Sequence, residues 1–166
     1  MSKTISDFQN FFQLSKEKEQ FNVLEECQKA IAIISASFAA HNIMLEIHAE
    51  ENLTIYGYPR EFAHAILNIL SNAKDIFLER KIIEPKIVFN IKAGRQYAVI
   101  NIEDNGGGIL IENINRVFEP YYSTKYPKQG TGIGLYMCKI IIEKNMRGFL
   151  NVKNIRNGAC FTIKLK

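Results

Sequence analysis

Apolar residues recur along this chain with two spacings, which predicts an alternation of helices and strands. Two long segments carry apolar residues three and four positions apart, as on the buried face of a helix. Shorter apolar runs bounded by turn-forming residues are typical of strands. The elements expected in this way are a helix over 24–41, strands over 43–49 and 53–56, a helix over 59–80, strands over 85–93 and 96–103, a short helix over 111–116, a helix over 132–145, and strands over 149–152 and 159–165.

These elements predict an α+β fold with two layers: a mixed sheet of about five strands with three main helices on one face. A chain of 166 residues is long enough to bury one real core. Residues 1–20 begin with helical spacing and end in a polar run, which predicts the end of an upstream helix and a linker. The globular domain is therefore expected over 21–166.

The composition of the chain limits which binding partners and which cellular compartment we expect. The chain is 47% apolar and 23% charged, which argues against disorder, and its net charge of +4 comes from scattered residues that make no case for nucleic acid. Cys27, Cys138 and Cys160 have no metal-binding spacing and are expected to be reduced. The apolar stretch 30–40 is far shorter than the ~20 residues of a bilayer span. We expect a cytoplasmic domain without membrane contact, while membrane anchoring of the full-length protein stays open.

Two amides on the helix 59–80 are the first candidates for chemistry. Asn68 and Asn72 are four positions apart, so their side chains share one face of that helix. A carboxamide beside a buried stripe needs a partner, and its oxygen suits Mg²⁺, which prefers oxygen ligands. On these residues alone, a pair of interior amides bonded to backbone is the alternative interpretation.

Two glycine-rich segments follow. Asp104 ends a predicted strand and precedes three consecutive glycines at 106–108, where a carboxylate could accept a hydrogen bond from the amine of adenine while the backbone approaches the ring. A plain Asp-Asn-Gly turn is the alternative. The second segment, Gly130-Thr131-Gly132-Ile133-Gly134, opens the helix 132–145, where free N–H groups favour phosphate; a simple hinge is the alternative.

The residues between these segments predict a mobile loop. The stretch 119–130 carries prolines, tyrosines and polar residues, and two lysines in it, Lys125 and Lys128, could swing over a terminal phosphate. Which of the two lysines would do so stays open.

Taken together, the motifs resemble those of the catalytic, ATP-binding domain of bacterial two-component sensor histidine kinases. The resemblance covers roughly residues 20–166, and the Ser-Thr-Lys ending at 123–125 is similar to the nitrogen-regulation-type kinases. The matching segments are 68–73 (the N box), 104–109 (the first glycine box), 117–125 (the F box) and 130–139 (the second glycine box).

The resemblance implies the Bergerat fold, ATP and Mg²⁺ as cofactors, and an ATP lid over about 119–130. It implies that Asn72 ligates the metal, that Asp104 reads adenine, and that Asn68 and Lys125 are catalytic. The remaining residues implied to bind nucleotide or hinge the lid are Gly106, Gly108, Lys125, Gly130, Thr131, Gly132, Gly134 and Leu135.

The implied reaction transfers the γ-phosphoryl group of ATP to a histidine on the dimerisation and histidine-phosphotransfer domain of the same protein, from which it passes to the cognate response regulator. No histidine of this chain is followed by Glu or Asp in such a phosphoacceptor box, so the acceptor is expected on a separate domain. The alternatives are a non-catalytic nucleotide sensor or scaffold of the same fold, and an anti-sigma-type serine kinase. The serine kinases carry a glutamate general base where Asn68 stands, and an amide cannot take a proton at neutral pH.

Overall fold

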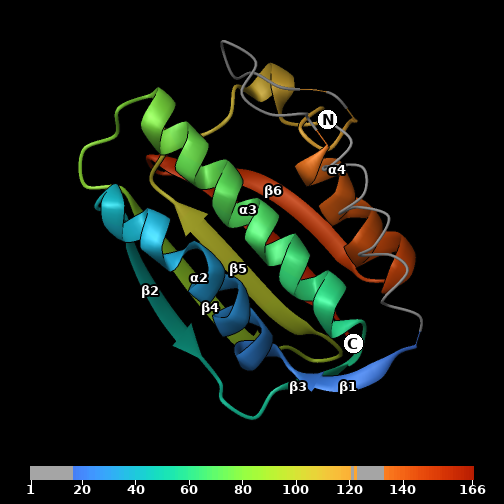
Figure 1. The fold of residues 1–166 in the computed structure, drawn as a ribbon. Helices are drawn as coiled ribbons and strands as arrows, with labels where there is room; N and C mark the ends of the chain where they lie inside the picture. Colours follow the sequence, from blue (N-terminus) through green and yellow to red (C-terminus); the bar gives the residue numbers. More distant parts are fainter. Residues whose placement is uncertain (1–16, 121, 123–132) are drawn as a thin grey trace, which may run out of the picture.

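The computed structural model describes residues 17–120, 122 and 133–166. Its helices lie on one side of the central sheet (Figure 1), as the sequence pattern predicts. In chain order the elements are β1 (Glu19–Asn22), α2 (Val23–Ala40), β2 (Met44–Ala49), β3 (Thr54–Gly57), α3 (Pro59–Glu79), β4 (Lys86–Ala93), β5 (Ala98–Asp104), η1 (Ile111–Asn113), α4 (Gly134–Lys139), η2 (Ile140–Asn145), β6 (Phe149–Ile155) and β7 (Gly158–Leu165).

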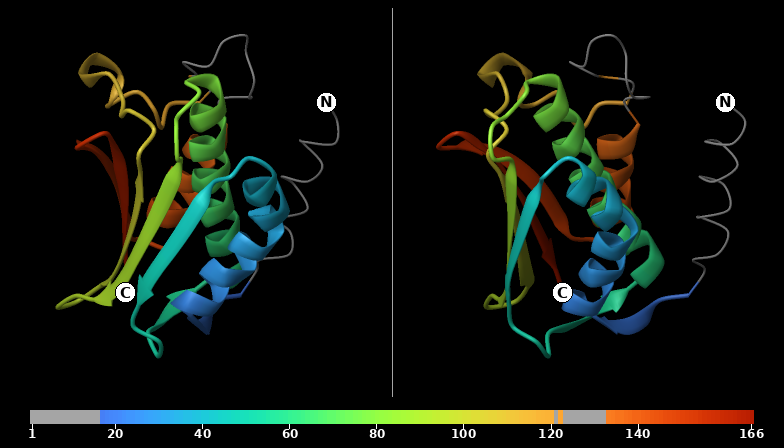
Figure 2. Two further views of the ribbon diagram at one scale, coloured as in Figure 1. Left: turned by 90° about the vertical axis from the view of Figure 1, so that its left-hand side faces the viewer. Right: turned by 60° about the vertical axis from the view of Figure 1, so that its left-hand side comes forward.

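The central sheet has five strands in the order β2-β4-β5-β7-β6. Strands β2 and β4 are parallel, and every other neighbouring pair is antiparallel, so the sheet is mixed. Figure 2 shows the helices packed against one face of this sheet, with the other face uncovered by helices. The predicted two-layer sandwich is therefore confirmed.

The core lies between α3 and the helix-facing side chains of the sheet. In β4, Ile87, Phe89 and Ile91 alternate with more exposed residues and are fully or almost fully buried. The apolar stripe predicted for the helix 59–80 is buried as expected, and α3 runs the length of the sheet as its central helix (Figure 1). The stripe residues are Ile66, Ile69, Leu70, Ala73 and Phe77.

One strand was not predicted. Residues 19–22 form β1, which pairs antiparallel with β3 in a separate two-stranded sheet. Phe21 of β1 is buried, and its ring centroid lies 5.4 Å from that of Phe62 in α3. Because Glu19 and Gln20 continue a polar run, nothing in their local pattern separates them from a linker; the contact of Phe21 with the core makes the strand.

Two helical predictions are confirmed only in part. The short helix expected over 111–116 is a 3₁₀ turn over Ile111–Asn113. The helix expected over 132–145 is α-helical in α4 and becomes a π-helix in η2. After η2, the Gly148 N–H donates to the Ile142 carbonyl at 2.7 Å, and a Cβ on Gly148 would lie only 2.3 Å from the Lys164 carbonyl oxygen of β7. Glycine at this position therefore lets β7 pass close to the chain between η2 and β6.

No helix within the described part of the chain combines the length and the apolar character that a bilayer crossing requires.

The start of α2 offers a stability test. The Asn22 side chain accepts a hydrogen bond from the Glu25 N–H at 2.9 Å and donates one to the Glu51 carbonyl at 2.8 Å. We expect Asn22→Ala to lower the free energy of unfolding by about 1–2 kcal/mol, because the first turn of α2 loses its cap. Urea denaturation measures the change. Asn151→Ala, at an exposed position of β6, is the control, and an equal loss in both variants would contradict the capping role.

Candidate functional site

The two candidate amides both lie on α3, and one of them contacts the second glycine segment. The Asn68 Nδ2 donates a hydrogen bond to the Gly134 carbonyl at 3.3 Å, at the first residue of α4. Asn72 lies one helical turn further on and is half-buried. Among the described residues, none forms a hydrogen bond with its carboxamide, so the oxygen is available to a ligand.

Helix α4 is held against α3. The thiol of Cys138 is fully buried and donates to the Ala65 carbonyl at 3.2 Å, and burial raises the pKa of this thiol to about 12. Gly134 itself is exposed, and a Cβ there would lie 3.8 Å from the Asn68 Cγ, which is ordinary contact. Leu135 is partly buried and packs against the core.

Asp104 is the last residue of β5, where the first glycine segment begins. Its Oδ1 accepts a hydrogen bond from the Gly106 N–H at 2.9 Å. Burial raises the pKa of the Asp104 carboxyl above its ordinary value, although the N–H groups of Gly106 and Ala159 and the charge of Arg80 oppose this shift. A half-buried acceptor at a strand end is suited to recognising a ligand N–H group.

The glycines that follow Asp104 are required by the backbone and by packing. Gly107 and Gly108 have φ angles of 96° and 82°, which disfavour any side chain. Gly106 is buried against α3, where a Cβ would lie 3.0 Å from the Ile76 Cγ2. Ile76 is one turn beyond Asn72, so this loop and the amide lie along the same stretch of α3.

Two side chains that the sequence analysis did not single out hold this loop. The Arg80 Nη1, just past the end of α3, donates to the Gly106 and Gly108 carbonyls at 2.7 and 2.8 Å. Asn154 of β6 accepts from the Ile109 N–H at 2.7 Å and donates to the Ile109 carbonyl at 2.6 Å. Nothing local in the sequence signals either role, because each side chain reaches a segment far away in the chain.

A third missed residue is Gly158, the first residue of β7. A Cβ on this glycine would lie 1.6 Å from the Asp104 carbonyl oxygen, so only glycine fits beside the strand end. The preceding residue, Asn157, has a φ of 65° and accepts the Gly107 N–H at 2.9 Å. The Asn-Gly pair is a known hairpin signal and could have indicated this turn, though not its contact with Asp104.

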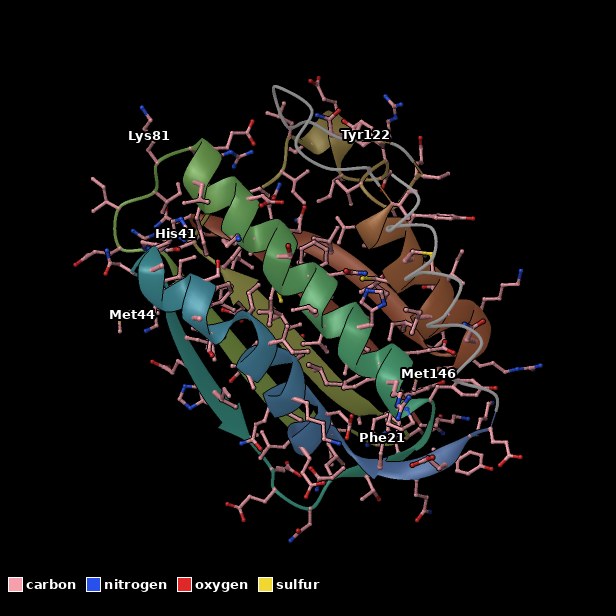
Figure 3. The ribbon with its side chains drawn as sticks, viewed as in Figure 1. Phe21, His41, Met44, Lys81, Tyr122 and Met146 are labelled. Atoms are coloured by element: carbon pink, nitrogen blue, oxygen red, sulfur yellow. The ribbon has the colours of Figure 1, made fainter. Side chains whose placement is uncertain are left out.

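Residues 114–120 are anchored against β7 and α4 through Phe118. The Phe118 ring lies edge-on to Phe161, with centroids 6.1 Å apart, and the Lys139 Nζ lies 4.8 Å from the Phe118 centroid. Beside it opens a groove of about 430 Å³ between residues 114–120, α4 and β6. Further along, the Arg116 guanidinium lies 4.5 Å from the centroid of Tyr122, which Figure 3 labels beside η1. This groove does not include Asn72 or Asp104.

The structure thus brings Asn68 and Gly134 into contact, and it places Asp104 at the start of the loop that holds Gly106 and Gly108, where Gly106 lies against α3. The other candidates, Lys125, Gly130, Thr131 and Gly132, lie outside the described residues, as do Lys128 and most of the predicted lid.

Comparison with known proteins gives concordant results. The family described as "Histidine kinase-, DNA gyrase B-, and HSP90-like ATPase" matches residues 57–166. Two-component sensor PprA of Pseudomonas aeruginosa is 29% identical over 140 residues, which are 82% of this chain and 15% of that protein. Sporulation kinase B of Bacillus subtilis is 30% identical over 161 residues, which are 94% of this chain and 36% of that protein. The chain therefore spans well under half the length of these curated relatives.

The fold recurs in solved structures. The catalytic domain of histidine kinase ThkA superimposes with a TM-score of 0.80 at 24% identity, covering 90% of this chain and 95% of that one. ThkA in complex with response regulator protein TrrA superimposes with a TM-score of 0.75 at 19% identity, covering 99% of this chain and 47% of that one. At these identities the likeness shows the fold, whereas the family match covers most of the chain's sequence. The chain belongs to the family of histidine kinase-, DNA gyrase B- and HSP90-like ATPases.

Proposed function

We propose that this chain binds MgATP and donates its γ-phosphoryl group to a histidine on the dimerisation and phosphotransfer domain of the same protein. In this proposal residues 21–166 form the catalytic domain, and residues 1–20 lead into it from a dimerisation helix through a linker, whose last residues Glu19 and Gln20 join strand β1. The acceptor domain and a cognate response regulator are its partners. Membership of an ATPase family and curated relatives named as sensors and kinases support this assignment.

One observation carries the proposal: a single face of α3 runs between the two glycine segments. Asn68 contacts Gly134, and Ile76 lies against Gly106, so Asn72 stands midway between the phosphate-binding and purine-binding segments expected from the sequence. Residues four apart on a helix lie above one another, so the order of these contacts follows the order of the chain. A nucleotide laid along this face would have its phosphates next to the Asn72 amide.

The side chains around Asn72 are suited to a magnesium ion that takes most of its ligands from the nucleotide and from water. The described residues contain no cluster of three carboxylate, histidine or cysteine side chains that could hold a metal by themselves. Mg²⁺ keeps several waters and commonly binds through one or two protein oxygens together with substrate phosphates. The Asn72 oxygen is suited to be such a ligand, and the bound ion would neutralise phosphate charge during transfer.

In the proposed reaction the protein contributes mainly positioning and charge. Asp104 orients the purine, the glycine loop admits it closely, and Asn72 holds the metal-bound phosphates. Asn68 cannot act as a general base, which suits an acceptor nitrogen better than a serine hydroxyl. We further propose that Lys125 contacts the γ-phosphate, with Lys128 as the alternative, and that the chain is of the nitrogen-regulation-like subtype.

The direct test mixes the protein with the matching acceptor domain, Mg²⁺ and ATP carrying a labelled γ-phosphate. We expect acid-labile label on the acceptor histidine, and its loss when that histidine is replaced. Nucleotide binding without transfer to the matched domain would instead favour the nucleotide sensor.

Asn72→Ala tests the metal assignment. We expect the affinity for MgATP to fall about tenfold, because an oxygen ligand of the ion is lost, while the affinity for ADP measured with a chelator stays unchanged. Titration calorimetry of both nucleotides measures the two effects. Equal losses with and without magnesium would contradict a role of Asn72 in holding the metal.

A further inference from the structure

We propose that Arg80 is a positioning residue of the nucleotide site: from the end of α3 it holds the loop 106–108 in the shape that presents Asp104 to the purine. This inference rests on the proposed function, since it assigns a task to a residue that touches the loop and not the nucleotide. In Figure 3 the neighbouring Lys81 is labelled just beyond the end of α3.

The contact geometry is that of a clamp. One nitrogen of the Arg80 guanidinium donates to the carbonyls on both sides of Gly107, at 2.7 Å to Gly106 and 2.8 Å to Gly108. On the other side of the loop, the Gly107 N–H donates to the Asn157 carbonyl at 2.9 Å. The peptide groups around Gly107 are therefore held from two directions, by α3 and by the β6–β7 turn.

A loop of this composition needs such a clamp. Three consecutive glycines have more backbone freedom than any other tripeptide, and two of them sit at positive φ, so their own preferences do not select this shape. Guanidinium donors form charge-assisted hydrogen bonds, which are stronger than neutral ones. A Cβ on Gly107 would lie 3.0 Å from the Arg80 Nη1, so the arginine occupies the space that a side chain there would take.

The clamp reaches Asp104 through a single residue. The same Gly106 whose carbonyl is bonded to Arg80 donates its N–H to the Asp104 Oδ1 at 2.9 Å. If the loop relaxed, the Gly106 N–H would no longer fix the direction of the carboxylate. The positive charge of Arg80 also opposes the rise in the pKa of Asp104 that burial causes, which favours the ionised acceptor.

A purely structural arginine would stabilise the fold without affecting which base is bound, so base preference is the informative readout. The amine of adenine donates to a carboxylate, whereas guanine presents an oxygen at the same place, and a well-oriented Asp104 should therefore favour ADP over GDP. We expect Arg80→Met to weaken ADP binding about tenfold and GDP binding much less, so that the ratio of the two affinities falls. Calorimetric titrations without magnesium measure both, which separates this effect from Asn72.

The matched control is Arg95→Met, which removes the same charge from the β4–β5 turn at the opposite end of β5. We expect it to leave both affinities unchanged. A thermal melt of each variant shows whether folded protein has been lost. Such a loss would lower the apparent affinities for ADP and GDP equally and leave their ratio unchanged. If Arg80→Met does not fold, Arg80→Lys carries the test, since it keeps the charge but lacks the reach and geometry of the guanidinium, and its ratio should fall as well.

The outcomes separate this inference from the proposed function. If the unaltered protein favours ADP and the Arg80 variants keep that preference, Arg80 does not position the loop, and the proposed function stands. If the unaltered protein binds neither nucleotide, the proposed function fails and this inference fails with it.

Discussion

Replacing Asp104 with asparagine is expected to weaken ADP binding about a hundredfold without destabilising the ligand-free protein. Asparagine has the same shape, and its oxygen can still accept the Gly106 N–H that the Asp104 Oδ1 accepts at 2.9 Å. The other oxygen becomes an NH₂ group, which would meet the adenine amine as donor against donor. The loss of a hydrogen bond to a charged acceptor, roughly 2–3 kcal/mol, gives this magnitude.

The stability side of this prediction follows from the direction of the pKa shift. Burial holds the pKa of Asp104 above its ordinary value in the folded protein, so the folded state binds this proton more tightly than the unfolded state. The group therefore favours folding at low pH and costs stability once the pH has risen above its folded-state pKa. Removing it at neutral pH should leave the melting temperature unchanged or raise it.

The same shift predicts how binding depends on pH. In the unaltered protein the affinity for ADP should fall as the pH is lowered through the raised pKa of Asp104, and the asparagine variant should lack this step. Glu103→Gln is the control, because adjacent residues of a strand point to opposite faces of the sheet. Calorimetric titrations from pH 8 downwards measure ADP binding to both proteins. If the Asp104→Asn variant binds ADP as tightly as the unaltered protein, Asp104 does not contact the purine.

Among the glycines that the structure describes, Gly158→Ala is expected to be the most destabilising alanine substitution, lowering the free energy of unfolding by about 3 kcal/mol. The new Cβ would lie 1.6 Å from the Asp104 carbonyl oxygen and 2.6 Å from its carbonyl carbon, so the backbone of β5 or of the β6–β7 turn must move. A loss of this size should lower the melting temperature by roughly 10 °C in a domain of this length.

Gly134→Ala provides the comparison in the ligand-free protein. Its Cβ would make only ordinary contact with Asn68, so its stability should stay within about 1 kcal/mol of the unaltered protein. Urea denaturation of the three proteins measures the difference. Similar stabilities for Gly158→Ala and Gly134→Ala would show that the strand end near Asp104 is not closely packed.

The spacing of apolar residues was enough to predict those helices and strands whose apolar face is buried in the core. The stripe Ile66, Ile69, Leu70, Ala73 and Phe77 specifies both the helix α3 and the face that it turns to the sheet. The order of Asn72, Asp104 and the glycine segments likewise predicted the family, because these residues recur in fixed order in the motifs that the chain resembles. The roles of the individual site residues stay predictions until nucleotide binding is measured.

Features that depend on distant contacts could not be predicted. Strand β1 pairs with β3 where Phe21 packs on the core, and Gly148 after η2 is needed because β7 passes close to it. Arg80 and Asn154 are ordinary polar residues in sequence. Only the folded chain brings Arg80 to Gly106, which is 26 residues later, and Asn154 to Ile109, which is 45 residues earlier. In each case the contact is made with a residue that is too far away in the sequence for local patterns to reveal it.

The pairing of β1 with β3 has a mechanical consequence. A force applied to the chain before Glu19 acts first on the β1–β3 ladder, and β3 leads through Tyr58 directly into α3, the helix that carries Asn72. Traction at this point therefore reaches the start of α3 through a single connecting residue, whereas α2 follows β1 without an intervening residue and is pulled at the same time. The small sheet is thus the joint through which upstream motion would be passed to the rest of the domain.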